Sequence, residues 1–319
     1  MTSSFRPLLP PHIVPPSDPD QRGTPIPFPR KNGSFTPVIR DTMSLTSWLL
    51  LGAVIQGLAC LLFGSRATIP ALLILIYRVT DHLLMTLNIT RNRYLDHVLL
   101  AKASPQIPHP TGTFGTEPSR DKIVVFHLGV RSHHPLGFLA PGMKGIADEF
   151  TAMVSEMQAD PEKVGLLGMS QFLKQESVAG NEILTIFYLR DYESLHRFAY
   201  GESHMKGVRY FADITKKCPH IGIFHETFVV PKGHWEAIYI NTEPTGLGDT
   251  WFLVNQTEQS GHENPAKEKV KKEEKGTGAR AFIRPLVDAR SGILRSKTGR
   301  LSMKKMEEAR QYDQVYGET

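Results

Sequence analysis

The sequence predicts an α+β domain with a ferredoxin-like arrangement, preceded by one or two transmembrane helices. Segments rich in β-branched and aromatic residues alternate with amphipathic helical patterns in the order β-α-β-β-α-β, followed by a terminal strand. An apolar stretch without charge lies upstream. These observations divide the chain into a disordered Pro-rich arm (1–43), a membrane anchor (44–88), a linker (89–119), a catalytic domain (120–254) and a basic, largely disordered tail (255–319).

The arm holds the proline pairs Pro10-Pro11 and Pro15-Pro16 and few residues that pack a core. This composition favours an extended, disordered chain. The first residues lack the basic start and apolar core of a secretory signal peptide, so we do not interpret them as one.

The first anchor segment, residues 45–63, is long enough to cross a bilayer as a helix. Trp48 near one end suits the membrane interface, and Gly52 and Gly57 are common in membrane helices. A buried helix of a soluble protein is the alternative interpretation.

A second apolar segment, residues 69–87, is interrupted by Arg78, Asp81 and His82. Charges at the centre of a bilayer are costly, so the segment is either a second span that forms a hairpin or an interfacial helix. We favour the hairpin, which leaves both flanks on one side. Basic residues before and after the anchor place these flanks in the cytoplasm, and we expect the endoplasmic reticulum membrane.

The domain begins with a strand over 123–130, followed by a helix over 141–159 with apolar residues at helical spacing. Two strands, at 164–172 and 182–189, come next, and Asp191 caps a second helix. The stretch 221–241 is again strand-like and is broken by Pro231, Lys232 and Gly233.

The stretch 221–241 carries two titratable groups side by side. Strand alternation places His225 with Ile223 and Thr227 on one face, and Glu226 on the opposite face. Burial of either group without a partner is costly, so each needs a catalytic pocket or a hydrogen-bonded place in the core or rim.

The net charge of +5 lies almost wholly in the tail, and the rest of the chain is balanced. This distribution gives no indication of a nucleic-acid-binding core. Two cysteines exclude a disulfide framework and a thiolate zinc site. The domain has no phosphate-binding glycine loop, no nucleophile elbow and no clear metal-ligand spacing, so we predict no metal site.

Three segments together carry a family resemblance: GVRSHHPL (129–136), FYLRDYESLHRFAYGESH (187–204) and IGIFHETFVVPKGHWEAIYIN (221–241). They resemble an uncharacterised family of bacteria and fungi that is grouped with the antibiotic-biosynthesis-type monooxygenases of the dimeric α+β-barrel superfamily. The resemblance covers roughly 120–254. The family usually has a Trp-rich helix after its histidine, whereas this chain has Lys206-Gly207-Val208-Arg209.

The resemblance implies a homodimer in which two sheets pair into a barrel, with a pocket between sheet and helices. Many members of the superfamily oxygenate without metal or flavin: a base removes a proton, and the carbanion reduces dioxygen. We therefore expect no cofactor, with haem, which other members bind, as the alternative.

The resemblance also supplies the candidate site. Matched to the family pattern are Arg131, His204, the pair His225 and Glu226, and Tyr239 with Asn241. We predict His225 and His204 as base or donor, Glu226 as the residue that orients or charges the pocket, and Arg131 as the group that stabilises negative charge. Since alternation separates His225 from Glu226, we expect His225 to face the substrate.

Predicted substrate-binding residues are His127, Tyr188, Tyr239 and Asn241. For His127, a buried and hydrogen-bonded core histidine is the competing interpretation. The function that follows is a membrane-anchored, cofactor-independent monooxygenase-like tailoring enzyme that acts on a hydrophobic polyketide or terpenoid intermediate. A cofactor-free cyclase, or a non-catalytic membrane partner of another enzyme, is the alternative.

Overall fold

The computed structural model describes residues 4–14, 40, 43–174, 182–254 and 280–301. Its largest element is a four-stranded antiparallel sheet with the order β4-β5-β3-β6. Its strands are β3 (Ile123–Ser132), β4 (Leu166–Leu173), β5 (Glu182–Leu189) and β6 (Ile221–Val230). Together with the helices between them, they form the β-α-β-β-α-β order, so the predicted α+β class is confirmed.

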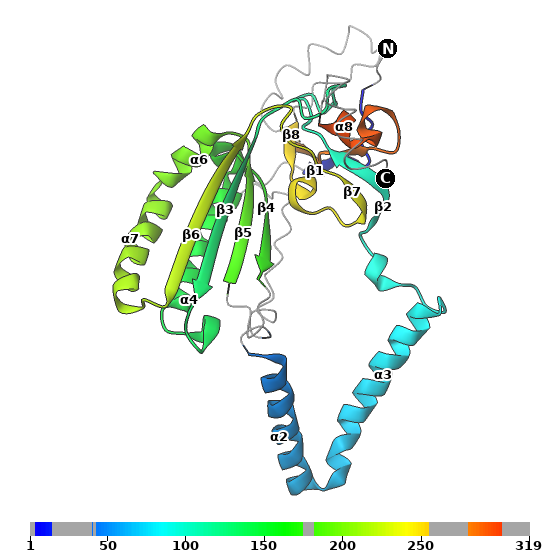
Figure 1. Cartoon of the computed structure of the whole chain (residues 1–319), viewed down its shortest axis with the longest axis vertical. Helices are drawn as coiled ribbons and strands as arrows, with labels where there is room; N and C mark the ends of the chain where they lie inside the picture. Colours follow the sequence, from blue (N-terminus) through cyan, green and yellow to red (C-terminus); the bar gives the residue numbers. More distant parts are fainter. Residues whose placement is uncertain (1–3, 15–39, 41–42, 175–181, 255–279, 302–319) are drawn as a thin grey trace, which may run out of the picture.

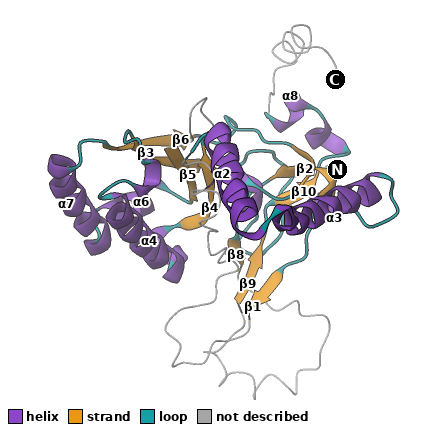
Figure 2. Cartoon of the chain, turned by 90° about the horizontal axis from the view of Figure 1, so that it is seen from below, coloured by secondary structure: helices purple, strands orange, loops and turns teal. Residues whose placement is uncertain are grey.

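The helices of this domain pack on one face of the sheet (Figures 1 and 2). They are α4 (Met143–Ala159), α5 (Pro161–Val164), α6 (Tyr192–Ala199) and α7 (Glu202–Lys217), and the short 3₁₀ helix η3 (Gly137–Leu139) precedes α4. Val124 and Phe126 of β3 pack with Met157 of α4 and Leu195 of α6, and Val130 packs near Phe211 of α7. This alternation defines the helix-covered face and leaves the odd-numbered residues of β3 on the other, open face.

The open face carries large apolar side chains that are partly uncovered. Phe172, Phe224 and Phe228 lie on it and are 48%, 41% and 46% exposed. At one end, Trp235 and Leu247 cover it and pack with residues of β3, β5 and β6. These two residues therefore cover one end of the open face, and the rest of the face stays open.

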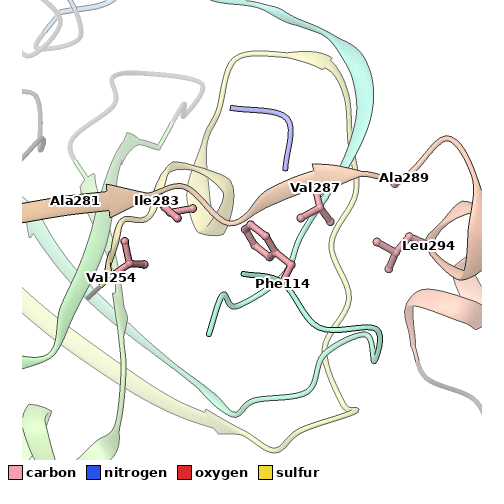
Figure 3. Close-up of a cluster of buried hydrophobic side chains, with 7 residues drawn as sticks. All are labelled: Phe114, Val254, Ala281, Ile283, Val287, Ala289 and Leu294. Atoms are coloured by element: carbon pink, nitrogen blue, oxygen red, sulfur yellow. The ribbon is translucent and has the colours of Figure 1, made fainter. Parts of the chain in front are cut away.

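Trp235 and Leu247 lie in the segments that connect β6 with the strands of two small antiparallel sheets. One has the order β10-β2-β7, from β2 (Leu99–Pro105), β7 (Tyr239–Thr242) and β10 (Leu286–Asp288). The other has the order β1-β9-β8, from β1 (His12–Val14), β8 (Phe252–Val254) and β9 (Arg280–Ile283). This part of the chain also contains the short helices η4 (Gly246–Asp249), η6 (Gly292–Arg295) and α8 (Lys297–Arg300). Figure 3 shows the hydrophobic core that these sheets share. In it, Phe114 packs with Val254, Ala281, Ile283, Val287, Ala289 and Leu294.

Three expectations are corrected by these small sheets. Residues 99–105, placed in the linker, form β2. The terminal strand β7 pairs with β2 and not with the main sheet. Residues 280–301, placed in a disordered tail, are packed and partly buried. The reason is pairing between segments far apart in the chain, which local periodicity does not reveal. The rest of the predicted arm and tail lies outside the described residues.

Two apolar helices, α2 (Leu45–Phe63) and α3 (Ile69–Thr86), are joined through η1 (Ser65–Thr68) and point away from the rest of the chain (Figure 1). By length and composition both are able to cross a membrane, and almost nothing of them is buried. Asp81 pairs with Arg93 of η2 (Arg93–Leu95) rather than with Arg78, and His82 lies 2.9 Å from the Tyr94 hydroxyl. Asp81 and His82 of α3 thus contact residues of the segment that follows this helix.

Candidate active site

A histidine-carboxylate pair lies on the open face of the main sheet. His127 of β3 stands directly opposite Glu226 of β6, and His127 Nδ1 is 3.5 Å from Glu226 Oε2. Phe228 packs edge-on against the imidazole at a centroid distance of 5.3 Å. The carboxylate therefore lies within ion-pair distance of the imidazole on this face.

Arg131 lies on the same open face, farther along β3. Its guanidinium is 3.2 Å from Glu182, which stands directly opposite it on β5 and which Lys174 also approaches at 3.6 Å. The predicted role of Arg131 in stabilising a developing negative charge therefore competes with an existing ion pair. We interpret Arg131 as a group that sets the charge of this end of the face.

Two tyrosines meet at the opposite end of the open face. Tyr188 of β5 stands beside Val125 of β3, and Tyr239 reaches the same place from β7. The backbone N–H of Gly248 in η4 donates to the Tyr239 hydroxyl at 3.1 Å. Burial raises the pKa of both phenols, and a hydrogen bond from the η4 backbone partly offsets this increase in each. Both therefore stay protonated at neutral pH.

His225 and His204 lie on the helix-covered side. His225 is opposite Leu128, so the predicted separation of His225 from Glu226 is confirmed. Its ring is exposed and contacts Phe126 at 5.7 Å, and the His204 ring contacts Phe198 at the same distance. Both aromatic residues belong to one hydrophobic cluster. Among the described residues, the buried His204 Nδ1 has no hydrogen-bond partner.

Asn241 is separate from these groups. It is exposed on β7 and has a left-handed backbone with φ of 49°. Asparagine tolerates this conformation better than most residues. The backbone conformation therefore explains why an asparagine occupies this position.

Sequence reasoning did not find the pairing of His127 with Glu226, nor the contact of the two tyrosines with η4. The first follows from the antiparallel register of β3 and β6. Both strands were predicted from their residue patterns, but the register between them was not. The second depends on a short 3₁₀ turn, which has no periodic sequence pattern. Four predicted residues, His127, Arg131, Tyr188 and Glu226, share the open face, whereas His204 and His225 do not.

In the part of the chain that the structure describes, no group of three or more His, Cys, Asp or Glu side chains is placed to hold a metal ion. One surface hollow lies along α3, beside Arg78 and His82, and another along residues 88–96. Both are remote in sequence from the pair on the open face.

A family model described as "Monooxygenase af470-like" matches residues 123–247. Monooxygenase af470 of Aspergillus fumigatus is 33% identical over 213 residues, which are 66% of this chain and 76% of that protein. SnoaB, a cofactor-independent oxygenase from Streptomyces nogalater, is 15% identical, with 34% of this chain and 91% of that chain covered and a TM-score of 0.24.

A putative antibiotic biosynthesis monooxygenase from Deinococcus radiodurans is 11% identical, with 33% of this chain and 89% of that chain covered and a TM-score of 0.23. The similarity to the Aspergillus protein spans most of that protein's length, and the family model covers the whole four-stranded sheet. The chain belongs to the monooxygenase af470-like family.

Proposed function

We propose that this protein is a membrane-anchored monooxygenase that needs no metal or flavin and acts on a hydrophobic polyketide or terpenoid intermediate. Family membership supports an oxygenase. The observation that carries the proposed chemistry is the His127–Glu226 pair on an apolar sheet face.

The proposed reaction begins at an acidic C–H group of the substrate. His127 takes the proton, and Glu226 stabilises the imidazolium. The resulting carbanion gives electrons to dioxygen and is protonated to a hydroperoxide. Loss of water then leaves a carbonyl where a CH₂ group stood. One oxygen atom enters the product and the other leaves as water, so the substrate itself supplies the electrons.

We place the base at His127 rather than at the predicted His225 or His204. A catalytic histidine needs a group that fixes its tautomer and orientation. His127 has one in Glu226, whereas His225 has an aromatic neighbour and no polar partner among the described residues. His204, with its buried and unpaired Nδ1, remains the proposed second donor on the helix-covered side.

The membrane anchor is part of the proposal. The hairpin exposes a continuous apolar surface, including Leu49, Leu61, Ile74 and Leu83, which a soluble protein rarely leaves open to water. A bilayer covers such a surface, and a hydrophobic substrate concentrates in the same bilayer. We propose that the domain is cytosolic and that the membrane is that of the endoplasmic reticulum.

We also propose a homodimer in which a second copy covers the open face. Phe172, Phe224 and Phe228 provide an apolar patch there. Closure over His127 and Glu226 would exclude water, which strengthens electrostatic interactions and protects a carbanion from protonation.

The test uses full-length protein in detergent micelles and an anthrone, a ketone with an acidic CH₂ group. Oxygen uptake and product are measured together, with heat-inactivated protein as the control for spontaneous oxidation. We expect one dioxygen consumed for each carbonyl formed, also after dialysis against a chelator and without added flavin or haem. Conversion of a pathway intermediate without oxygen uptake would favour the cyclase, and a lack of any turnover would favour the non-catalytic partner.

A further inference from the structure

Tyr188 and Tyr239 place two hydroxyl groups around one point of the η4 backbone. A Cβ atom placed on Gly246 would lie 3.0 Å from Tyr188 Oη and 3.5 Å from Tyr239 Oη. Gly246 has a φ of 54°, which a residue with a side chain rarely adopts. The two phenols thus converge on a small space that glycine leaves open.

The phenol protons are not used within the described residues. Tyr239 Oη accepts the backbone N–H of Gly248, and the backbone of Leu247 hydrogen-bonds to the Tyr188 hydroxyl. A phenol oxygen that accepts a hydrogen bond still has its own proton to donate. No described residue accepts this proton from either tyrosine, so two oriented donors remain available next to each other.

The neighbourhood indicates what these donors serve. Tyr188 is directly opposite Val125, which is two residues before His127 on the same face of β3. Phe228 stands opposite Val125 on the other side and also contacts the His127 ring. A continuous apolar strip therefore connects the tyrosine hydroxyls with the His127–Glu226 pair.

We propose that Tyr188 and Tyr239 together form an oxyanion site that binds the enolate or phenolate oxygen of the substrate. The inference rests on the proposed function, and it names the substrate class: an enolisable ketone or an acidic phenol. The oxygen of the substrate lies at η4, and the acidic C–H group of the substrate extends along the apolar strip to His127. Removal of the proton places negative charge on the oxygen, where two neutral, partly buried donors stabilise it.

Oxyanion binding is tested without turnover, with nitrophenols of graded acidity as probes. Binding to full-length protein is followed by the absorbance of the phenolate, and empty micelles give the partition background. We expect the bound phenol to ionise at lower pH than the free phenol, and we expect affinity to rise with phenol acidity. Equal binding of the neutral and ionised forms would overturn the proposal.

Single substitutions identify the donors. Tyr188→Phe and Tyr239→Phe should each weaken phenolate binding about tenfold or more, as expected for a hydrogen bond to a charged group. Tyr200→Phe, at an exposed tyrosine of the same domain, is the matched control and should change nothing. Gly246→Ala should also weaken binding, because its methyl group enters the space between the hydroxyls.

Thermal unfolding of each variant separates lost binding from lost structure. A Phe variant that keeps the wild-type melting temperature and binds phenolate as tightly as the wild type contradicts the proposal. If a Phe variant is unstable, the comparison passes to the other tyrosine. The two proposals fail separately. His127→Gln should strongly reduce oxygen uptake yet retain phenolate binding. Tyrosine-dependent phenolate binding without oxygenation by the wild type would refute only the monooxygenase.

Discussion

At the scale of single residues, the chemistry depends on which face of the sheet each side chain occupies. His225 and Glu226 are neighbours in sequence, yet one contacts Phe126 and the other His127. The carboxylate of Glu226 therefore lies next to the imidazole of His127, nearly a hundred positions earlier, and not next to that of the adjacent His225. Strand alternation puts the two side chains on opposite faces, and the antiparallel register of β3 and β6 brings Glu226 opposite His127.

His127→Gln should reduce oxygenation by about 10²–10⁴-fold, the usual contribution of a general base. Glu226→Gln should reduce it less, because the imidazole then loses only the carboxylate beside it. Steady-state oxygen uptake measures both effects. His225→Gln is the matched control. A fully active His127→Gln with an inactive His225→Gln would place the base on the helix-covered side.

At the scale of elements, Asp191 shows how a local signal fixes a helix. Its carboxylate accepts the backbone N–H of Ser194 at 2.7 Å at the start of α6 and a hydrogen bond from Arg190 at 2.9 Å. Burial raises the pKa of this group, but these hydrogen bonds outweigh burial and lower the pKa to about 2. The cap predicted from the sequence is confirmed.

Asp191→Ala should destabilise the protein by about 0.5–2 kcal/mol, the usual effect of losing such a cap. Because the folded-state pKa is below the unfolded value, the stabilisation is present above about pH 4 and is lost as the pH falls toward about 2. Chemical denaturation at pH 7 and at low pH measures the difference between variant and wild type. An equal difference at both pH values would contradict the prediction. Asp213→Ala, at an exposed position of α7, is the control.

The apolar hairpin is the second element that carries a prediction. Replacement of residues 44–88 by a flexible Gly/Ser linker should give a protein that stays in solution without detergent and keeps the thermal transition of the body. Removal of residues 1–105 should not, because it also removes β2 from between β7 and β10. Sedimentation and thermal scans compare the two. An insoluble linker variant would mean that the hairpin packs against protein rather than lipid.

At the scale of the whole molecule, segments from both ends of the chain meet beside the main sheet. β1, β2 and residues 280–301 pair with segments that follow β6. Arg300, whose side chain is 7% exposed, bonds to Glu236 and to the carbonyls of Leu294 and Arg295. This contact holds the late helix α8 against the segment that covers the open face.

Arg300→Ala should destabilise the protein by about 3–5 kcal/mol, because it leaves Glu236 without its buried partner. Truncation after residue 279 should have a larger effect, since it removes β9 and β10 and opens the core shown in Figure 3. Denaturant titration measures the first and limited proteolysis the second. A truncated protein as resistant to proteolysis as the wild type would show that these strands contribute nothing. Arg209→Ala, at an exposed arginine of α7, provides the comparison.

The elements whose signals are local could be predicted from the amino-acid sequence. Alternation in 123–132, 182–189 and 221–230 gave the strands, the cap at Asp191 gave a helix start, and a charge-free run gave α2. Strand register and long-range pairing, in contrast, depend on how distant segments fold together. His127 meets Glu226, Tyr188 meets Tyr239, and residues 280–301 enter a core because distant segments pair through backbone hydrogen bonds that almost any residue makes. Such pairings leave little trace in composition or period, so the site they assemble emerges only when the chain is folded.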